Sequence, residues 1–190
     1  MPLQEDATYE NIDFSGKEIF DEEYVKCEFI NCDFSKSNLR KSDFIDCVFR
    51  GCNFSLASLD HTGLKDVKFI SCKLIGVNFS VCNNFLFSVS FSDSHLDYSS
   101  FFQKKMKKCV FTNCSLKEVD FEEAELSMAV FDKCNLEQAR FIKTVLEKAD
   151  FRTAVNYAFD PEINKIKKAK FTYPGVLGLL ARYDIDIEFD

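Results

Sequence analysis

The sequence predicts an all-β solenoid, a four-sided coil in which each side is one five-residue unit. A large apolar residue recurs at every fifth position from Phe14 to Phe79 and again from Phe91 to Phe151. A period of five matches neither the 3.6 residues of a helix nor the alternation of a strand. It therefore indicates a repeat architecture.

The number of sides follows from the second half, where the large residues alternate between Phe and Leu or Met. A three-sided coil of fifteen residues would stack Phe on Leu, whereas a four-sided coil of twenty stacks like on like. The Phe column that this predicts is Phe91, Phe111, Phe131 and Phe151, with Phe101, Phe121 and Phe141 on the opposite side.

A small residue precedes each large one by two positions, so both lie on the same side of an extended segment. Eight of the nine cysteines occupy this small slot, and only Cys82 falls elsewhere. Their spacings of five and twenty are not those of zinc ligands. We expect packed free thiols, with metal binding or disulfides as the alternatives, and no cofactor. The eight are Cys27, Cys32, Cys47, Cys52, Cys72, Cys109, Cys114 and Cys134.

The repeat is interrupted once, because twelve residues separate Phe79 from Phe91 where two units would need ten. The two extra residues must bulge or bend the rod. We expect one continuous solenoid domain: an N-terminal section over residues 1–80, a discontinuity over 81–90, a C-terminal section over 91–155, and a final coil, capping helix and tail over 156–190.

The C-terminal region predicts a short helix with Thr172 or Tyr173 near its N-cap and Pro174 in its first turn. The end of a β-solenoid needs a cap. The apolar residues of this helix exceed one narrow stripe, which favours a cap that also joins two protomers over a cap alone. The residues expected at that dimer interface are Val176, Leu177, Leu180 and Tyr183.

Four lysines form the one basic cluster, Lys104, Lys105, Lys107 and Lys108. Lys104 falls on an inward small slot, where an unpaired ammonium is very unfavourable. Either the backbone bulges to expose it, or its stem is buried and its charge reaches outward. The cluster is interpreted as a solvated corner or as a partner-contact site.

The net charge of −7 is unevenly distributed. Residues 1–30 carry nine acids and two bases, and residues 184–190 carry four acids, so the remainder has 18 acids against 22 bases. The best acidic stripe lies on one side of the first half and is diluted by Lys26 and Lys65. We define the acidic stripe as Glu22, Glu23, Asp43, Asp46 and Asp66.

The sequence shows no pattern of residues typical of a catalytic site. The two histidines, His61 and His95, lie far apart in the repeat, and the sequence contains no glycine-rich phosphate loop, G-x-S-x-G or H-E-x-x-H motif. We therefore expect that the protein is not an enzyme. The N-terminal residues do not resemble a signal peptide and no apolar stretch approaches the length of a membrane span. We expect a cytoplasmic protein without direct nucleic-acid or membrane binding.

The repeat resembles that of the pentapeptide-repeat proteins over residues 12–151. Units such as Cys32-Asp33-Phe34-Ser35-Lys36 and Ala149-Asp150-Phe151-Arg152-Thr153 fit the family consensus. The resemblance implies a right-handed quadrilateral β-helix. About seven coils at a strand spacing of about 4.8 Å would give a rod about 34 Å long.

Within that family, the break and the segment over residues 44–55 resemble the quinolone-resistance (Qnr) group. The chain lacks the projecting loops of some members, since only Arg50 separates Phe49 from Gly51 and no residues are added near 102–108. The resemblance implies a homodimer joined through the C-terminal helix that binds DNA gyrase or topoisomerase IV as a DNA mimic and protects it from quinolones or toxins.

The alternative hypothesis is an interaction scaffold with an unrelated protein partner. A continuous acidic ridge would favour the topoisomerase hypothesis. An exposed apolar patch would favour the scaffold, and its candidate residues are Val25, Ile30, Ile45 and Ile70.

Overall fold

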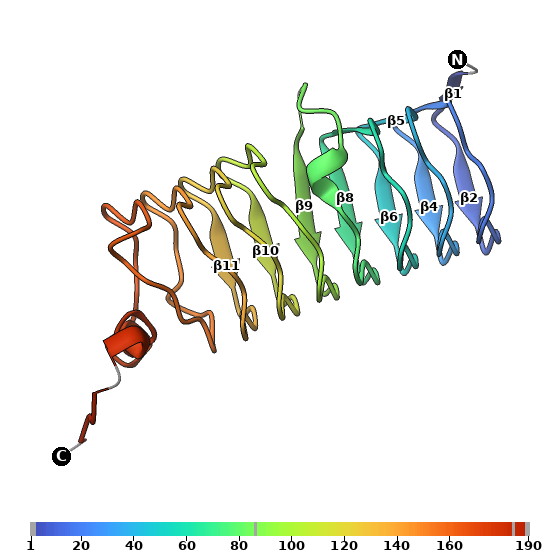
Figure 1. Cartoon of the computed structure of the whole chain (residues 1–190). Coiled ribbons are helices and arrows are strands. Elements are labelled where there is room, and N and C mark those ends of the chain that lie inside the picture. The colour runs from blue at the N-terminus through green and yellow to red at the C-terminus, as the bar shows by residue number, and fades with distance from the viewer. Residues whose placement is uncertain (1–2, 86, 184, 189–190) are drawn as a thin grey trace.

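The computed structural model describes residues 3–85, 87–183 and 185–188, and shows a rod-shaped parallel β-solenoid (Figure 1). Its longer sheet extends from the first coil to β11 (Val130–Asp132), and the shorter sheet lies on a second side of the first half. The longer sheet contains β2 (Thr8–Glu10), β4 (Glu28–Ile30), β6 (Val48–Arg50), β8 (Val67–Ile70), β9 (Val89–Ser92), β10 (Val110–Thr112) and β11 (Val130–Asp132). The shorter sheet contains β1 (Leu3–Glu5), β3 (Glu23–Val25), β5 (Asp43–Ile45) and β7 (Gly63–Lys65).

Strand pairing confirms the coil of twenty residues. Phe29 pairs with Phe49 and Phe49 with Phe69 in parallel ladders. The two remaining sides are joined by isolated bridges with the same spacing, such as Asp33 with Asn53. The ladder of the longer sheet continues beyond β11 as isolated bridges to Asp150 and Lys170. The predicted all-β quadrilateral β-helix is confirmed.

The corners of the coil use left-handed backbone at every fifth residue. Lys36, Leu56 and Asn113 have φ values of 55°, 59° and 52°. This conformation is uncommon outside glycine, asparagine and aspartate. The turn is therefore imposed by the repeat and its ladder hydrogen bonds more than by the residue at each corner.

The core consists of stacked aromatic rings. Phe111 lies between Phe91 and Phe131, with its ring centroid 5.2 Å from each of theirs. The three rings are nearly parallel, with interplanar angles of 8° and 3°. Phe121 belongs to the opposite column and meets Phe111 edge to face at 6.0 Å. Both are fully buried. The inward assignment of the large residues is confirmed.

The small slots are also hydrogen-bonding positions. The Cys52 thiol donates to the carbonyl oxygen of Phe29, 23 residues earlier, at 3.4 Å. Hydroxyl groups make the same contact in other coils: Thr62 donates to Leu39 at 2.8 Å. All nine cysteines are free and buried, so the expectation of packed thiols is confirmed. The slot selects small residues that can reach the preceding coil.

The break adds its two residues without interrupting the longer sheet. The His61 amide donates to the Val81 carbonyl, a spacing of twenty, whereas Val67 pairs with Val89, a spacing of 22. The extra pair therefore lies between Val81 and Val89, next to the 3-10 helix η1 (Phe79–Val81). The division into sections 1–80 and 91–155 stays a prediction, because the ladder is continuous across it.

The C-terminal cap, predicted as a short helix, is formed by two short 3-10 helices, η2 (Pro174–Leu179) and η3 (Ala181–Tyr183). Tyr173 is the N-cap and Pro174 begins η2 as predicted. Leu179 is buried against the last coil. Gly178 permits this close approach, because a Cβ there would lie 2.1 Å from the Tyr157 carbonyl oxygen.

Candidate interaction surfaces

The acidic stripe lies on the side of the rod that carries β1, β3, β5 and β7. Glu23 and Asp43 are direct ladder partners, and Asp46 and Asp66 occupy successive corners. The series is interrupted at Gly63, which pairs with Asp43. Glycine at this position lets the Asp43 carboxylate lie over the backbone, since a Cβ there would be 2.0 Å from its Oδ1.

Burial raises the pKa of Asp43, and the neighbouring carboxylates of Glu23 and Asp21 raise it further. The stripe thus concentrates negative charge at one point. It remains sparse beside a DNA duplex, which carries one charge per about 1.7 Å of axis. The expected dilution is visible at Lys65, which pairs with Ile45 and so lies in the coil that follows Asp43.

Lys105, Lys107 and Lys108 lie on the same side of the rod as the acidic stripe, beyond the break. They line one hollow with Phe87 and Ser88, and Phe85 lines another with Asp43 and Lys65. The break segment, residues 82–88 without the undescribed Leu86, therefore separates the acidic stripe from the lysines. In Figure 1 it rises above the line of coils beside β9.

Both alternatives expected for Lys104, an exposed side chain and a charge that reaches solvent, are wrong. Lys104 is 1% exposed, so the backbone does not bulge to expose it and its ammonium does not reach solvent. Its Nζ donates to the Cys82 carbonyl oxygen at 2.5 Å and to Asn84 Oδ1 at 2.8 Å, and lies 4.8 Å from the centre of the Phe87 ring. All three acceptors belong to the break segment.

Lys104 is therefore separate from the exposed part of the lysine cluster. Its desolvation lowers the pKa of the ammonium, an effect partly opposed by the Cys82 thiol. The residue has a structural position and is not available to a partner. The candidate contact set from the basic cluster reduces to the three exposed lysines.

Sequence reasoning missed a second basic cluster on this side. Bridges connect Lys105 to Glu125, Glu125 to Val145 and Val145 to Lys165. Counting in steps of twenty therefore places residues 165–168 three coils beyond residues 105–108. The lysines so aligned are Lys105, Lys107, Lys108, Lys148, Lys165, Lys167 and Lys168, all exposed. Within the described residues none of them forms an ion pair.

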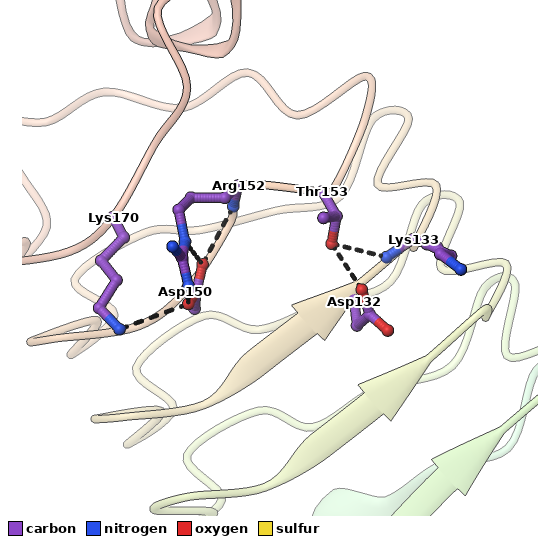
Figure 2. Close-up of polar contacts among 6 residues, drawn as sticks. All are labelled: Asp132, Lys133, Asp150, Arg152, Thr153 and Lys170. Carbon is purple, nitrogen blue, oxygen red and sulfur yellow. Dashed lines mark hydrogen bonds and ion pairs between the residues drawn. The ribbon is translucent and has the colours of Figure 1, made fainter.

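A groove of 660 Å³ crosses the neighbouring side near the C-terminal cap. Its apolar lining comes from Val110 and Val130. Figure 2 shows its polar rim, where Asp150 contacts Arg152 at 2.8 Å and Lys170 at 3.5 Å. Hydrogen bonds from the Arg152 side chain hold the pKa of Asp150 down at about 2.

The same rim continues to the preceding coil. Thr153 donates to Asp132 at 2.8 Å and accepts from the Lys133 amide at 3.0 Å (Figure 2). The polar groups joined in Figure 2 are thus paired with one another, and these contacts give no indication of a bound ligand. The groove remains a shallow surface feature.

The apolar residues proposed for a scaffold patch do not form one surface. Val25 and Ile45 are ladder partners on the shorter sheet, whereas Ile30 and Ile70 lie on the longer sheet with Arg50 between them. All four are half-buried. The cap presents more apolar surface, with Val176 38% and Tyr183 45% exposed and Leu177 and Leu180 half-buried.

Some chemistry is absent from the part of the chain that the structure describes. It contains no group of three or more histidine, cysteine or acidic side chains that could hold a metal ion. The described helices include none of the length and apolar character that crossing a membrane requires.

Comparison with known proteins identifies the repeat. A family model for a pentapeptide repeat region matches residues 23–101, and one for pentapeptide repeats matches residues 120–155. No curated protein matches the sequence.

Solved structures of QnrB1, described as a plasmid-mediated fluoroquinolone resistance protein, share the fold. One trypsin-treated variant has a TM-score of 0.73 at 15% identity, with 99% of both chains covered. Another has a TM-score of 0.60 at 18% identity, covering 95% of this chain and 100% of that one. The full-length protein has a TM-score of 0.50 at 19% identity, covering 96% and 100%. At these identities the likeness is one of fold.

Proposed function

The chain belongs to the pentapeptide-repeat family, and from that premise we propose that it is a non-enzymatic protein that binds a type II topoisomerase, DNA gyrase or topoisomerase IV. Binding would protect the enzyme from quinolones or toxins. The observation that carries the proposal is the match along 99% of both chains to QnrB1, a fluoroquinolone resistance protein. The site of action would be the cytoplasm.

The acidic stripe is the surface that supports DNA mimicry. Glu23 and Asp43 present carboxylates at successive coils, about 4.8 Å apart, and so do the corner residues Asp46 and Asp66. A cleft that binds DNA is positively charged and attracts such a surface. The contact would be confined to the first half of the rod, because the same side is basic beyond the break.

The rod would reach the length of a DNA-binding cleft as a dimer joined at the C-terminal caps. Val176 and Tyr183 supply exposed apolar surface there, and two-fold pairing is the commonest way in which homo-oligomers close. Leu177 and Leu180 would be covered in that dimer. This arrangement leaves the acidic stripes at the two far ends.

A gyrase supercoiling assay with and without a fluoroquinolone tests the proposal. We expect the protein to restore supercoiling in the presence of the drug. The variant Glu23→Gln with Asp46→Asn should lose this protection, while Glu118→Gln with Glu137→Gln, an equal loss of charge in the second half, should retain it. Protection that is absent at every protein concentration would contradict the proposal.

The second candidate is a scaffold for an unrelated protein, and the charge distribution favours it. A duplex is uniformly anionic, whereas one side of this rod changes from acidic to basic at the break. A partner with both charges would fit that side better than a DNA-binding cleft. Failure of the supercoiling assay with a folded protein would select this candidate.

A further inference from the structure

One side of the rod is self-complementary in charge. We call it the charged face, and it comprises the outward residues of β1, β3, β5 and β7 with the corners that follow them, and their equivalents at 105–108, 125–128, 145–148 and 165–168. Before the break it carries six carboxylates and two lysines, a net of −4. Beyond the break it carries seven lysines and two glutamates, a net of +5.

The break segment places an apolar side chain at the point where the charge reverses. Phe85 is 75% exposed, although a large aromatic side chain is favoured in a buried position. Beside it lies a hollow of 170 Å³, lined by Asp43, Ile45, Gly63 and Lys65. An exposed ring thus lies next to a recess on the same face.

A two-fold axis between the coil of Gly63 and the coil of Phe85 would make both features complementary. In an antiparallel pair, the partner's Phe85 would enter this hollow, and Phe85 would enter the equivalent hollow of the partner. One coil further out on each side, Asp43 and Asp46 would face the partner's Lys105 and the partner's Lys108. Contacts related in this way are those of an isologous interface.

Other occupants of the charged face fit less well. A nucleic acid or an anionic membrane along the rod would be attracted beyond the break and repelled before it, and the whole chain has a net charge of −7. In the antiparallel register above, a second copy places Asp43 and Asp46 against the lysines of residues 105–108 in both copies at once, whereas Glu23 lies near the partner's Glu125 and the lysines of residues 165–168 extend beyond the contact. The partner's Phe85 also accounts for the recess, which a polyanion would leave empty.

We propose that the charged face is a self-association surface on which two copies of this chain pair side by side and antiparallel. The interface is distinct from the C-terminal cap and does not depend on the proposed function. Because it covers Asp43 and Asp46, the paired state would withhold the acidic stripe from any other partner. An axis between the coils of Gly63 and Phe85 overlaps eight coils of each copy, a contact roughly 35–40 Å long.

Sedimentation velocity of the full chain over 1–200 µM, in about 50 mM and about 500 mM salt, tests the proposal. We expect the association constant to fall at least tenfold at the higher salt concentration, because exposed charges are screened. Phe85→Ser should weaken association by a similar factor at both salt concentrations. Leu180→Glu should leave the salt-dependent step intact.

A charge exchange provides the decisive measurement. Asp43→Lys with Asp46→Lys, and separately Lys105→Glu with Lys108→Glu, should each reduce association at least tenfold. The two variants mixed in equal amounts, or combined in one chain, should restore it. The control Lys36→Glu with Lys133→Glu makes the same change in net charge as Lys105→Glu with Lys108→Glu, but on other sides of the rod, and should have no effect. Circular dichroism melts verify that each variant is folded.

The proposal would be overturned by a salt-independent association, by an exchange that fails to restore pairing, or by a control variant that reduces pairing equally. Binding of a DNA duplex that is lost only in Lys105→Glu with Lys108→Glu, without salt-dependent self-association, would also overturn it and would assign the lysines to nucleic acid.

Discussion

The contact between Lys104 and the break segment leads to a prediction that separates a structural lysine from a surface one. Lys104→Ala removes three methylene groups and the ammonium from a slot that is 1% exposed. The lost burial amounts to about 0.8 kcal/mol per methylene. It also leaves the buried Cys82 carbonyl oxygen without its donor, which costs about 1–3 kcal/mol.

One effect opposes these losses: the variant no longer carries the unfavourable burial of the Lys104 ammonium. Desolvation already lowers the pKa of Lys104, so the ammonium is not fully compensated by its contacts. We therefore expect Lys104→Ala to lower the free energy of unfolding by about 2–4 kcal/mol, which is about 1.4 kcal/mol less than the summed losses of burial and hydrogen bonding. Lys104→Met keeps most of the stem and removes the charge, so its loss should be smaller, about 1–2 kcal/mol.

Urea unfolding with hydrogen exchange measures both the global and the local effect. Amides of residues 82–88 should lose protection in Lys104→Met before the rest of the solenoid does. The matched control Lys105→Met changes an exposed neighbour and should remain within about 0.5 kcal/mol of wild type. A stability of Lys104→Ala equal to that of wild type would refute the reasoning.

The difference in stability between wild type and Lys104→Met should depend on pH, and the direction of that dependence follows from the lowered pKa of Lys104. A lysine whose folded pKa is lowered binds fewer protons in the folded state than in the unfolded state between the two pKa values. The stability of wild type relative to Lys104→Met should therefore increase as pH rises toward the unfolded pKa of about 10.4. An opposite slope would mean that the ammonium is stabilised where it lies.

Four further predictions address the core, the slots, the acidic stripe and the cap. Phe121→Ala should lose about 3–5 kcal/mol in urea unfolding, because it leaves a cavity inside an aromatic column. Cys52→Ser should unfold within about 1 kcal/mol of wild type and more stably than Cys52→Ala, since a hydroxyl can donate to Phe29 as the thiol does. Asp43→Asn should raise the melting temperature at pH 7. Because the pKa of Asp43 is raised, the folded state favours its protonated carboxyl group and is destabilised when that group ionises, so the gain should vanish below about pH 3.9. Leu180→Glu should shift the full chain from dimer to monomer in light scattering at tens of micromolar, and a wild-type chain that is already monomeric there would contradict the cap interface.

The five-residue period was sufficient to predict the fold, because every inward position depends only on spacing within the unit. The columns of Phe91 and Phe101 followed from the same spacing and are present in the structure. The short cap helix was placed correctly at Tyr173 and Pro174, and the structure adds that its turns are of the 3-10 type. A repeat pattern does not determine the ends of a solenoid, where packing on the last coil selects the backbone.

The surfaces were harder to predict, since they depend on counting between coils. Lys104 was recognised as an inward lysine, yet its acceptors could not be identified until the two extra residues were located between Val81 and Val89. The alignment of Lys165 with Lys105 required only steps of twenty. It was missed because the apolar pattern fades after Phe151, although the coil continues.

The break is where the separate features of this chain meet. Its two additional residues project Phe85 outward, and the same segment supplies the carbonyl of Cys82 and the ring of Phe87 that satisfy the inward Lys104. A lysine in a small slot would be unstable in any coil without such an insertion, and an insertion without the lysine would lose its tie to the coil that follows. The two departures from the repeat are therefore best understood as one structural unit. That unit lies where the surface charge reverses, so a change at Lys104 should alter self-association through the position of Phe85 without any change in surface charge.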